Sequence, residues 1–117
     1  MKSKLEEISL QRKRAHTKLL ANASKVYDCF LTMERIAYSD GALSKKHKEL
    51  TGLGIALVRD CESGMQWHVE QAHIAGATFE ELLETIGVAI EMDGGPAVVS
   101  ARFALEVMES IHIKPSR

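Results

Sequence analysis

Apolar residues recur at helical spacing along almost the whole chain. Between positions 25 and 38, for example, Val26, Phe30 and Met33 fall at i, i+4 and i+7, on one side of a helix. The sequence has no sustained alternation of apolar and polar residues, the pattern of a half-buried strand. The pattern therefore predicts an all-α fold with an antiparallel helical core. The expected helices, about six of them, span residues 5–20, 25–38, 45–59, 62–75, 79–92 and 96–111.

Residues that start and stop helices stand at the predicted boundaries. Ser44 is a candidate N-cap for the third helix, and Gly76 is a typical residue just after the end of the fourth. Thr78 and Glu81 form a capping-box pattern, in which each side chain accepts a hydrogen bond from the other residue's backbone N–H. Pro96 suits the first turn of the last helix.

The last predicted helix is apolar on more than one side. A helix of this kind must be covered on most of its surface, and 117 residues offer limited cover. We therefore expect other copies of the chain to supply part of it, and predict a homo-oligomer.

The length of 117 residues predicts a single domain, spanning 1–117, that can bury a core without metal or disulfide staples. Its two cysteines are too few for a disulfide framework, which favours a reducing, cytoplasmic location. The charged N-terminal segment does not resemble a signal peptide, and apolar runs are too short to span a bilayer. We expect no membrane association.

Charge is unevenly distributed along the chain. Residues 1–59 carry 12 Lys/Arg and 6 Asp/Glu, whereas residues 60–117 carry 3 Lys/Arg and 10 Asp/Glu. No aromatic or recognition-helix pattern accompanies the basic residues, so nucleic-acid binding is not expected. Surfaces of opposite charge that face each other, within a subunit or between subunits, account for the asymmetry.

The segment from 60 to 68 is the main candidate for chemistry. Cys61 falls at the predicted start of a helix, where exposed N–H groups and the helix dipole favour a thiolate. Gly64 and His68 follow at i+3 and i+7 on the same face. Seven residues correspond to about 10 Å of axial rise, so a direct Cys61–His68 hydrogen bond requires the cysteine to bend inward from the cap. The missing side chain of Gly64 is expected to leave room for a water or small ligand.

Glu49, on the preceding helix, is the third candidate. A carboxylate among apolar residues needs a partner or a function, and facing His68 it can orient the imidazole or act as the base. Structural roles remain open for Cys61 and His68, as a packing cysteine and a core histidine. Cys29 is expected to be a core residue of its helix. Scattered histidines form no metal-ligand set, and no phosphate-binding loop follows a strand, so we expect neither a metal nor a cofactor.

The spacing of Glu49, Cys61, Gly64 and His68 resembles the E-x11-C-x2-C-x3-H motif of the carboxymuconolactone decarboxylase and alkylhydroperoxidase D-like superfamily. The resemblance is strongest over residues 40–108. It includes the segments 41–50, 76–81 and 95–97. The resemblance implies an all-helical fold that assembles into homotrimers or hexamers, with a site near a subunit interface and a small-molecule substrate.

Gly64 departs from that motif. In the peroxidase-type members of the superfamily, the second motif cysteine attacks and the first resolves the product to a disulfide. Here Gly64 occupies the attacking position, so the resemblance carries over only Cys61, His68 and Glu49. Cys29 can replace the missing thiol only if its Cα lies within about 7 Å of that of Cys61.

Three functions are compatible with these residues. The first is peroxiredoxin-like oxidoreductase activity, in which a hydroperoxide oxidises Cys61 and an external thiol reductant restores it. The second is acid–base decarboxylase or lactone chemistry on a small carboxylic acid, with His68 and Glu49 moving protons. The third is a non-catalytic member that has kept the fold and lost the paired cysteines.

Overall fold

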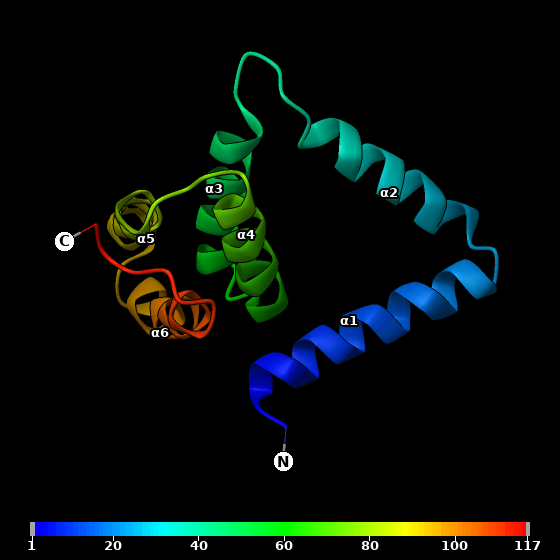
Figure 1. The fold of residues 1–117 in the computed structure, drawn as a ribbon, viewed down its shortest axis with the longest axis horizontal. Coiled ribbons are helices and arrows are strands. Elements are labelled where there is room, and N and C mark those ends of the chain that lie inside the picture. Colours follow the sequence, from blue (N-terminus) through cyan, green and yellow to red (C-terminus); the bar gives the residue numbers. More distant parts are fainter. Residues whose placement is uncertain (1, 117) are drawn as a thin grey trace. The chain divides into compact units, whose positions relative to one another are not determined.

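The computed structural model describes residues 2–116, and the all-α prediction is confirmed: these residues form six helices and no strand (Figure 1). The chain divides into two compact units, Met1–Ser39 and Asp40–Arg117. The prediction of a single domain over 1–117 stays a prediction. The helices are α1 (Lys4–Ala21), α2 (Lys25–Ala37), α3 (Lys45–Val58), α4 (Glu62–Ile74), α5 (Phe79–Asp93) and α6 (Gly95–Ser110).

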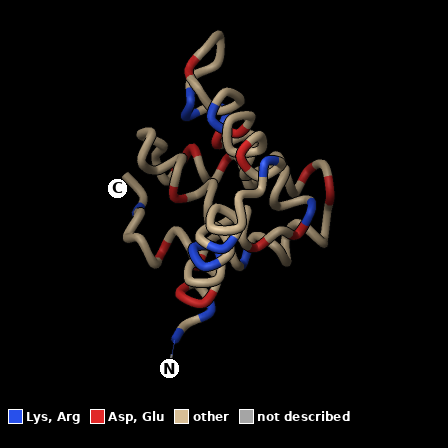
Figure 2. The backbone as a smooth tube through the Cα atoms, turned by 90° about the vertical axis from the view of Figure 1, so that its right-hand side faces the viewer, with Lys and Arg blue, Asp and Glu red and all other residues tan. Residues whose placement is uncertain are grey.

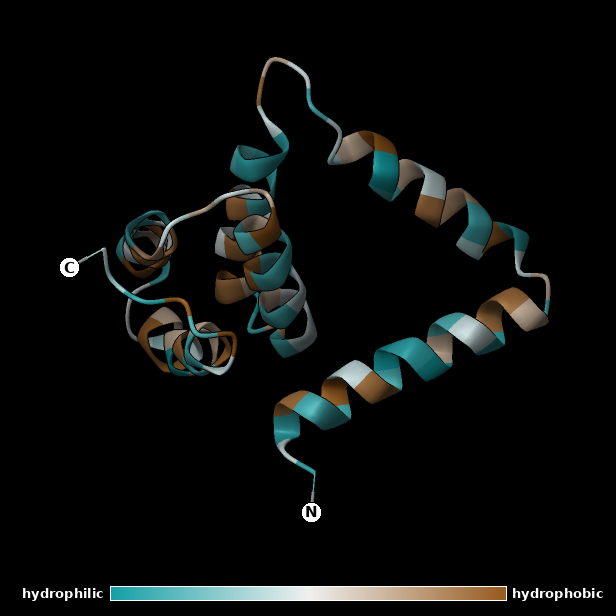
Figure 3. Cartoon of the chain, in the orientation of Figure 1, coloured by the Kyte–Doolittle hydropathy of each residue, from teal (hydrophilic) through white to brown (hydrophobic). Residues whose placement is uncertain are grey.

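The first unit contains α1 and α2, each begun by a serine N-cap. An edge-on ring contact joins His16 to Tyr27, whose hydroxyl is hydrogen-bonded to the imidazole Nδ1 at 2.5 Å. Neither helix has a fully buried residue. The prediction that Cys29 is a core residue is wrong for this unit, because its side chain is exposed. Apolar residues of α2, including Val26, Met33 and Ile36, are exposed. Figure 3 shows hydrophobic and hydrophilic residues interspersed along this helix.

The second unit contains α3 to α6 and holds the hydrophobic core. Helix α3 packs against α4, α5 and α6, and α6 also packs against α4 and α5. Burying apolar side chains between helices is the main favourable contribution to such a fold. The largest fully buried apolar side chains are Leu53, Leu57, Met65, Val69, Leu82, Val107 and Met108.

The predicted cap residues act as expected in this unit. The Ser44 side chain accepts the N–H of His47 at the start of α3. Thr78 and Glu81 make both hydrogen bonds of the capping box that opens α5. Gly76 has φ 99°, the left-handed conformation that favours glycine after a helix. These caps fix where α3 begins, where α4 ends and where α5 begins.

Candidate functional site

A tight turn between α3 and α4 places Cys61. Two hydrogen bonds close the turn: Asp60 N–H donates to the Leu57 carbonyl at 3.2 Å and Cys61 N–H to the Ala56 carbonyl at 2.9 Å. This is the Schellman pattern, in which the residue after the helix adopts a left-handed conformation. Asp60 occupies that position with φ 51°. The turn reverses the chain, so that α4 begins beside the end of α3.

Cys61 is the N-cap residue of α4, as the sequence predicted. Its backbone is extended (φ −96°, ψ 95°), and Sγ accepts the N–H of Gly64 at 3.3 Å. The side chain is exposed and the thiol is free. A sulfur at this place is near the N–H groups at the helix start, which stabilise negative charge, and it can be reached by a reactant from outside.

Gly64 does not leave an empty space, and that prediction is wrong. A Cβ atom at this residue would lie 3.1 Å from Cys61 Sγ and 3.2 Å from the Ala56 Cβ. The thiol turns back over its own helix to reach the amide, and so occupies the volume that a side chain would need. Gly64 therefore allows the sulfur–amide contact.

Glu49 and His68 meet between α3 and α4. The carboxylate Oε1 lies 2.8 Å from His68 Nδ1, and the second oxygen, Oε2, lies 2.6 Å from Lys45 Nζ. Glu49 is only 2% exposed, and His68 is 15% exposed. Because a carboxylate accepts hydrogen bonds, Nδ1 is the donor, which leaves Nε2 of a neutral ring as the basic nitrogen. The pair can therefore hold the imidazole in one tautomer and one orientation.

Lys45 was missed in the sequence analysis, although a signal for it was present. Lysine and glutamate four residues apart on one helix are neighbours, and Lys45 precedes Glu49 by four. The ammonium group neutralises a carboxylate that would otherwise be costly to bury. Of the candidate residues, the structure joins Glu49 directly to His68, and Cys61 lies at the start of the helix that carries this histidine.

An ion pair between Lys46 and Glu81 links the basic and acidic halves of the sequence within the second unit. Lys46 Nζ lies 2.8 Å from Glu81 Oε2, and this hydrogen bond, with that from the Thr78 N–H, lowers the pKa of Glu81. It joins the start of α3 to the start of α5, which agrees with the expectation that surfaces of opposite charge face each other. The positions of the charged residues along the backbone are shown in Figure 2.

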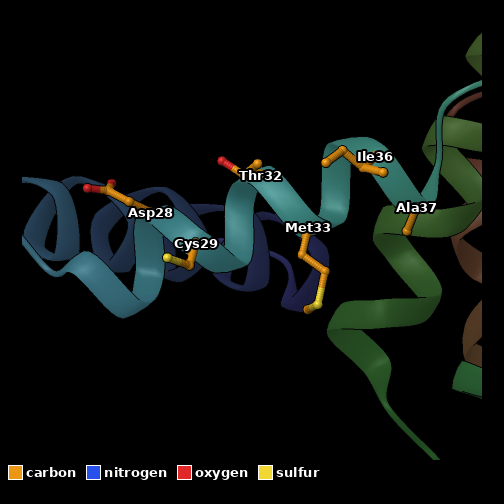
Figure 4. Close-up of a pocket in the computed structure, with 6 residues that line it drawn as sticks. All are labelled: Asp28, Cys29, Thr32, Met33, Ile36 and Ala37. Atoms are coloured by element: carbon orange, nitrogen blue, oxygen red, sulfur yellow. The ribbon is translucent and has the colours of Figure 1, made fainter.

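The first unit has an open groove of about 580 Å³ along α2. In Figure 4, Cys29, Met33 and Ala37 project from one side of the helix, and Asp28, Thr32 and Ile36 from the other. The lining is mostly apolar and lacks the convergent polar groups of a typical ligand site. This groove is therefore a candidate contact surface, and the polar groups suited to chemistry lie in the second unit.

Comparison with known proteins identifies the class. Residues 24–107 match the model of the carboxymuconolactone decarboxylase family, and the chain belongs to that family, within the alkylhydroperoxidase D-like superfamily. An uncharacterised protein from the cox locus of Paracoccus denitrificans is 38% identical over 88 residues, covering 75% of this chain and 79% of that protein. An uncharacterised protein of Cupriavidus necator is 32% identical over 83 residues, covering 71% and 74%.

Solved structures agree with the fold. A family member from Legionella pneumophila, crystallised in its apo form, superposes with a TM-score of 0.88 at 33% identity, covering 93% of this chain and 97% of that one. A Thermotoga maritima protein superposes with a TM-score of 0.83 at 24% identity, covering 91% and 93%, and supports the fold alone. Within residues 2–116, no helix has the length and apolar character needed to cross a membrane.

Proposed function

We propose that this protein is a thiol-dependent hydroperoxide reductase that works with one motif cysteine, Cys61. The observation that carries the proposal is the exposed sulfur at the start of α4, which accepts the Gly64 N–H at 3.3 Å. The N–H groups at the start of a helix direct their positive ends at a sulfur in this position, and the sulfur is the nucleophile of this chemistry. Exposure allows a peroxide and then a reductant to reach it.

The reaction has three balanced steps. The Cys61 thiolate attacks one peroxide oxygen, so that an S–O bond forms, the O–O bond breaks and an alcohol leaves after taking up a proton. An external thiol then attacks the sulfenic sulfur, forming a mixed disulfide and releasing water. A second external thiol attacks the outer sulfur of that disulfide, which restores the Cys61 thiolate and releases the oxidised reductant.

His68 supplies and accepts protons in this proposal. Glu49 holds Nδ1 at 2.8 Å, which leaves Nε2 to exchange protons with the reacting groups. Lys45 keeps the carboxylate aligned from the other side at 2.6 Å. Because these three groups are held by α3 and α4 together, the imidazole is oriented before a substrate arrives.

The first experiment is turnover of a small hydroperoxide with dithiothreitol as the reductant. We expect Cys61→Ser to abolish consumption, because the attacking sulfur is lost, and Cys29→Ser to retain it. His68→Ala is expected to slow consumption about 100-fold, within the usual contribution of a general acid–base group. Equal consumption by the wild-type and Cys61→Ser proteins would exclude the proposal.

The second candidate is acid–base chemistry on a small carboxylic acid, such as a lactone acid. It is favoured by the buried Glu49, which contacts both His68 and Lys45. In that case His68→Ala abolishes loss of the lactone acid, and Cys61→Ser does not. Inactivity of the wild-type protein in both assays would favour the third possibility, a non-catalytic family member.

We also propose that the protein works as a homo-oligomer, a trimer or a hexamer. Support comes from large apolar side chains left exposed on α2, where Val26 is 82% exposed and Met33 is 59% exposed. Helix α6 adds the exposed apolar side chains of Val98, Val99 and Leu105. Contiguous exposed apolar surface is typical of an interaction site. Light scattering is expected to give a multiple of the 12.9 kDa chain mass, which Met33→Glu lowers; a wild-type monomer at micromolar concentration would contradict the proposal.

A further inference from the structure

We propose that Asp60 and Ser100 are positioning residues, and that the hydrogen bond between them holds Cys61 in its reactive place. The inference rests on the proposed function in one respect, because Cys61 is taken as the reacting thiol. The Ser100 hydroxyl donates to Asp60 Oδ1 at 2.8 Å. The two residues are 40 apart in the sequence, and the bond joins α6 to the turn between α3 and α4.

The backbone at Asp60 is the first reason to assign it a role. Its φ of 51° lies in the left-handed region, where residues with a Cβ are disfavoured and glycine is the usual choice after a helix. A glycine here would close the same turn with less strain. An aspartate gives a side chain that can reach another helix, and in this structure it does so.

The surroundings of Ser100 are the second reason. This serine is 5% exposed and lies on a helix whose other buried residues are apolar. A buried hydroxyl needs a hydrogen-bond partner, and the Asp60 carboxylate provides a charged acceptor, which makes a stronger bond than a neutral one. The turn is therefore attached to the packed core of the second unit.

The attachment of the turn to α6 also restricts the position of the Cys61 sulfur. Cys61 directly follows Asp60, and its own N–H is bonded to the Ala56 carbonyl at 2.9 Å. The Met65 N–H donates to the Cys61 carbonyl at 2.8 Å, so the peptide groups on both sides of Cys61 are held, and together they set the direction of the Cα–Cβ bond toward Gly64. Without the contact to Ser100, the turn can adopt other conformations in which Sγ no longer reaches the Gly64 N–H.

The test compares four single variants and the double variant Asp60→Gly/Ser100→Ala, all made in a Cys29→Ser background so that one thiol is measured. Asp60→Gly keeps the left-handed backbone and removes the contact, and Ser100→Ala removes the donor. Asp60→Asn keeps an acceptor and loses the charge. Ser110→Ala is the matched control, since it removes a hydroxyl that bonds the Val107 carbonyl at the other end of α6. Circular dichroism first establishes the temperature at which every variant is folded.

The readout is the rate of iodoacetamide alkylation of Cys61 as a function of pH. We expect Ser100→Ala and Asp60→Gly each to slow alkylation at pH 6 by about threefold, because the sulfur is no longer held beside the Gly64 N–H. The double variant should behave like either single one, because both remove the same contact. Asp60→Asn and Ser110→Ala should match the parent protein.

Two results would overturn the inference. One is a Ser100→Ala profile that superposes on the parent profile. The other is a loss of reactivity in Asp60→Asn as large as that in Asp60→Gly, because the amide keeps an acceptor for Ser100 and the removal of a negative charge beside the thiol acts in the opposite direction. Hydroperoxide turnover separates this inference from the proposed function. If the parent protein shows no turnover but Ser100→Ala shifts the alkylation profile, the positioning role stands and the reductase proposal fails.

Discussion

Replacing Gly64 with alanine tests whether the thiol fills the space over this residue. Glycine is about 1 kcal/mol less favourable than alanine inside a helix, so the change alone would stabilise α4. The new Cβ, however, would lie 3.1 Å from Cys61 Sγ and 3.2 Å from the Ala56 Cβ. Overpacking of this kind costs about 1–3 kcal/mol. We therefore expect Gly64→Ala to lower the free energy of unfolding by about 1 kcal/mol.

Gly87→Ala is the matched control for this prediction. Gly87 lies in α5, and a Cβ there would have nothing within 4 Å, so the alanine is expected to stabilise the protein by about 1 kcal/mol. Urea unfolding followed by circular dichroism should separate the two variants by about 2 kcal/mol, and adding Cys61→Ala to Gly64→Ala should recover part of the loss. If Gly64→Ala stabilises as much as Gly87→Ala, the thiol does not occupy that space.

Three further predictions follow from the second unit. In a Cys29→Ser background, Gly64→Cys should form a disulfide with Cys61 on mild oxidation, because a Cβ at 64 would lie 3.5 Å from the Cys61 Cβ, within the disulfide range; two free thiols remaining by mass spectrometry would refute this. Glu49→Ala should lower the free energy of unfolding by about 3 kcal/mol in urea, because it removes two hydrogen bonds to a buried carboxylate, from His68 and from Lys45. A loss under about 1 kcal/mol would contradict this role for Glu49. Ser116 lowers the pKa of Glu80 from 4.5 through hydrogen bonds from its backbone N–H and its hydroxyl. The wild-type protein should therefore be more stable than Glu80→Gln at neutral pH, and this advantage should disappear as the pH falls through the folded-state pKa of Glu80. An advantage that persists in acid would contradict this prediction.

The helices were predictable from the sequence because their signals are local. The Thr78–Glu81 capping box and the serine at 44 each act within one turn of chain, and both are confirmed. The meeting of Glu49 and His68 was also expected, since a carboxylate on one helix and an imidazole on the next had matching motif positions. The structure supplies the contact at 2.8 Å.

The features that sequence reasoning missed depend on tertiary placement or on side-chain conformation. The contact between Asp60 and Ser100 joins residues 40 apart, and no local pattern indicates it. The space over Gly64 was misjudged because the rotamer of Cys61, which directs the sulfur back toward the helix, cannot be inferred from spacing. Cys29 follows an apolar pattern that predicts burial, but a periodic pattern does not show whether another element covers the face, and in this structure α2 has no buried residue.

The most direct measurement of the central claim is the reaction of one equivalent of hydroperoxide with the Cys29→Ser protein, with dimedone present to trap sulfenic acid and mass spectrometry to locate the adduct. We expect the adduct to form on Cys61, and to form about tenfold faster in the folded protein than in urea. Equal or slower labelling in the folded protein would show that the start of α4 does not activate this thiol.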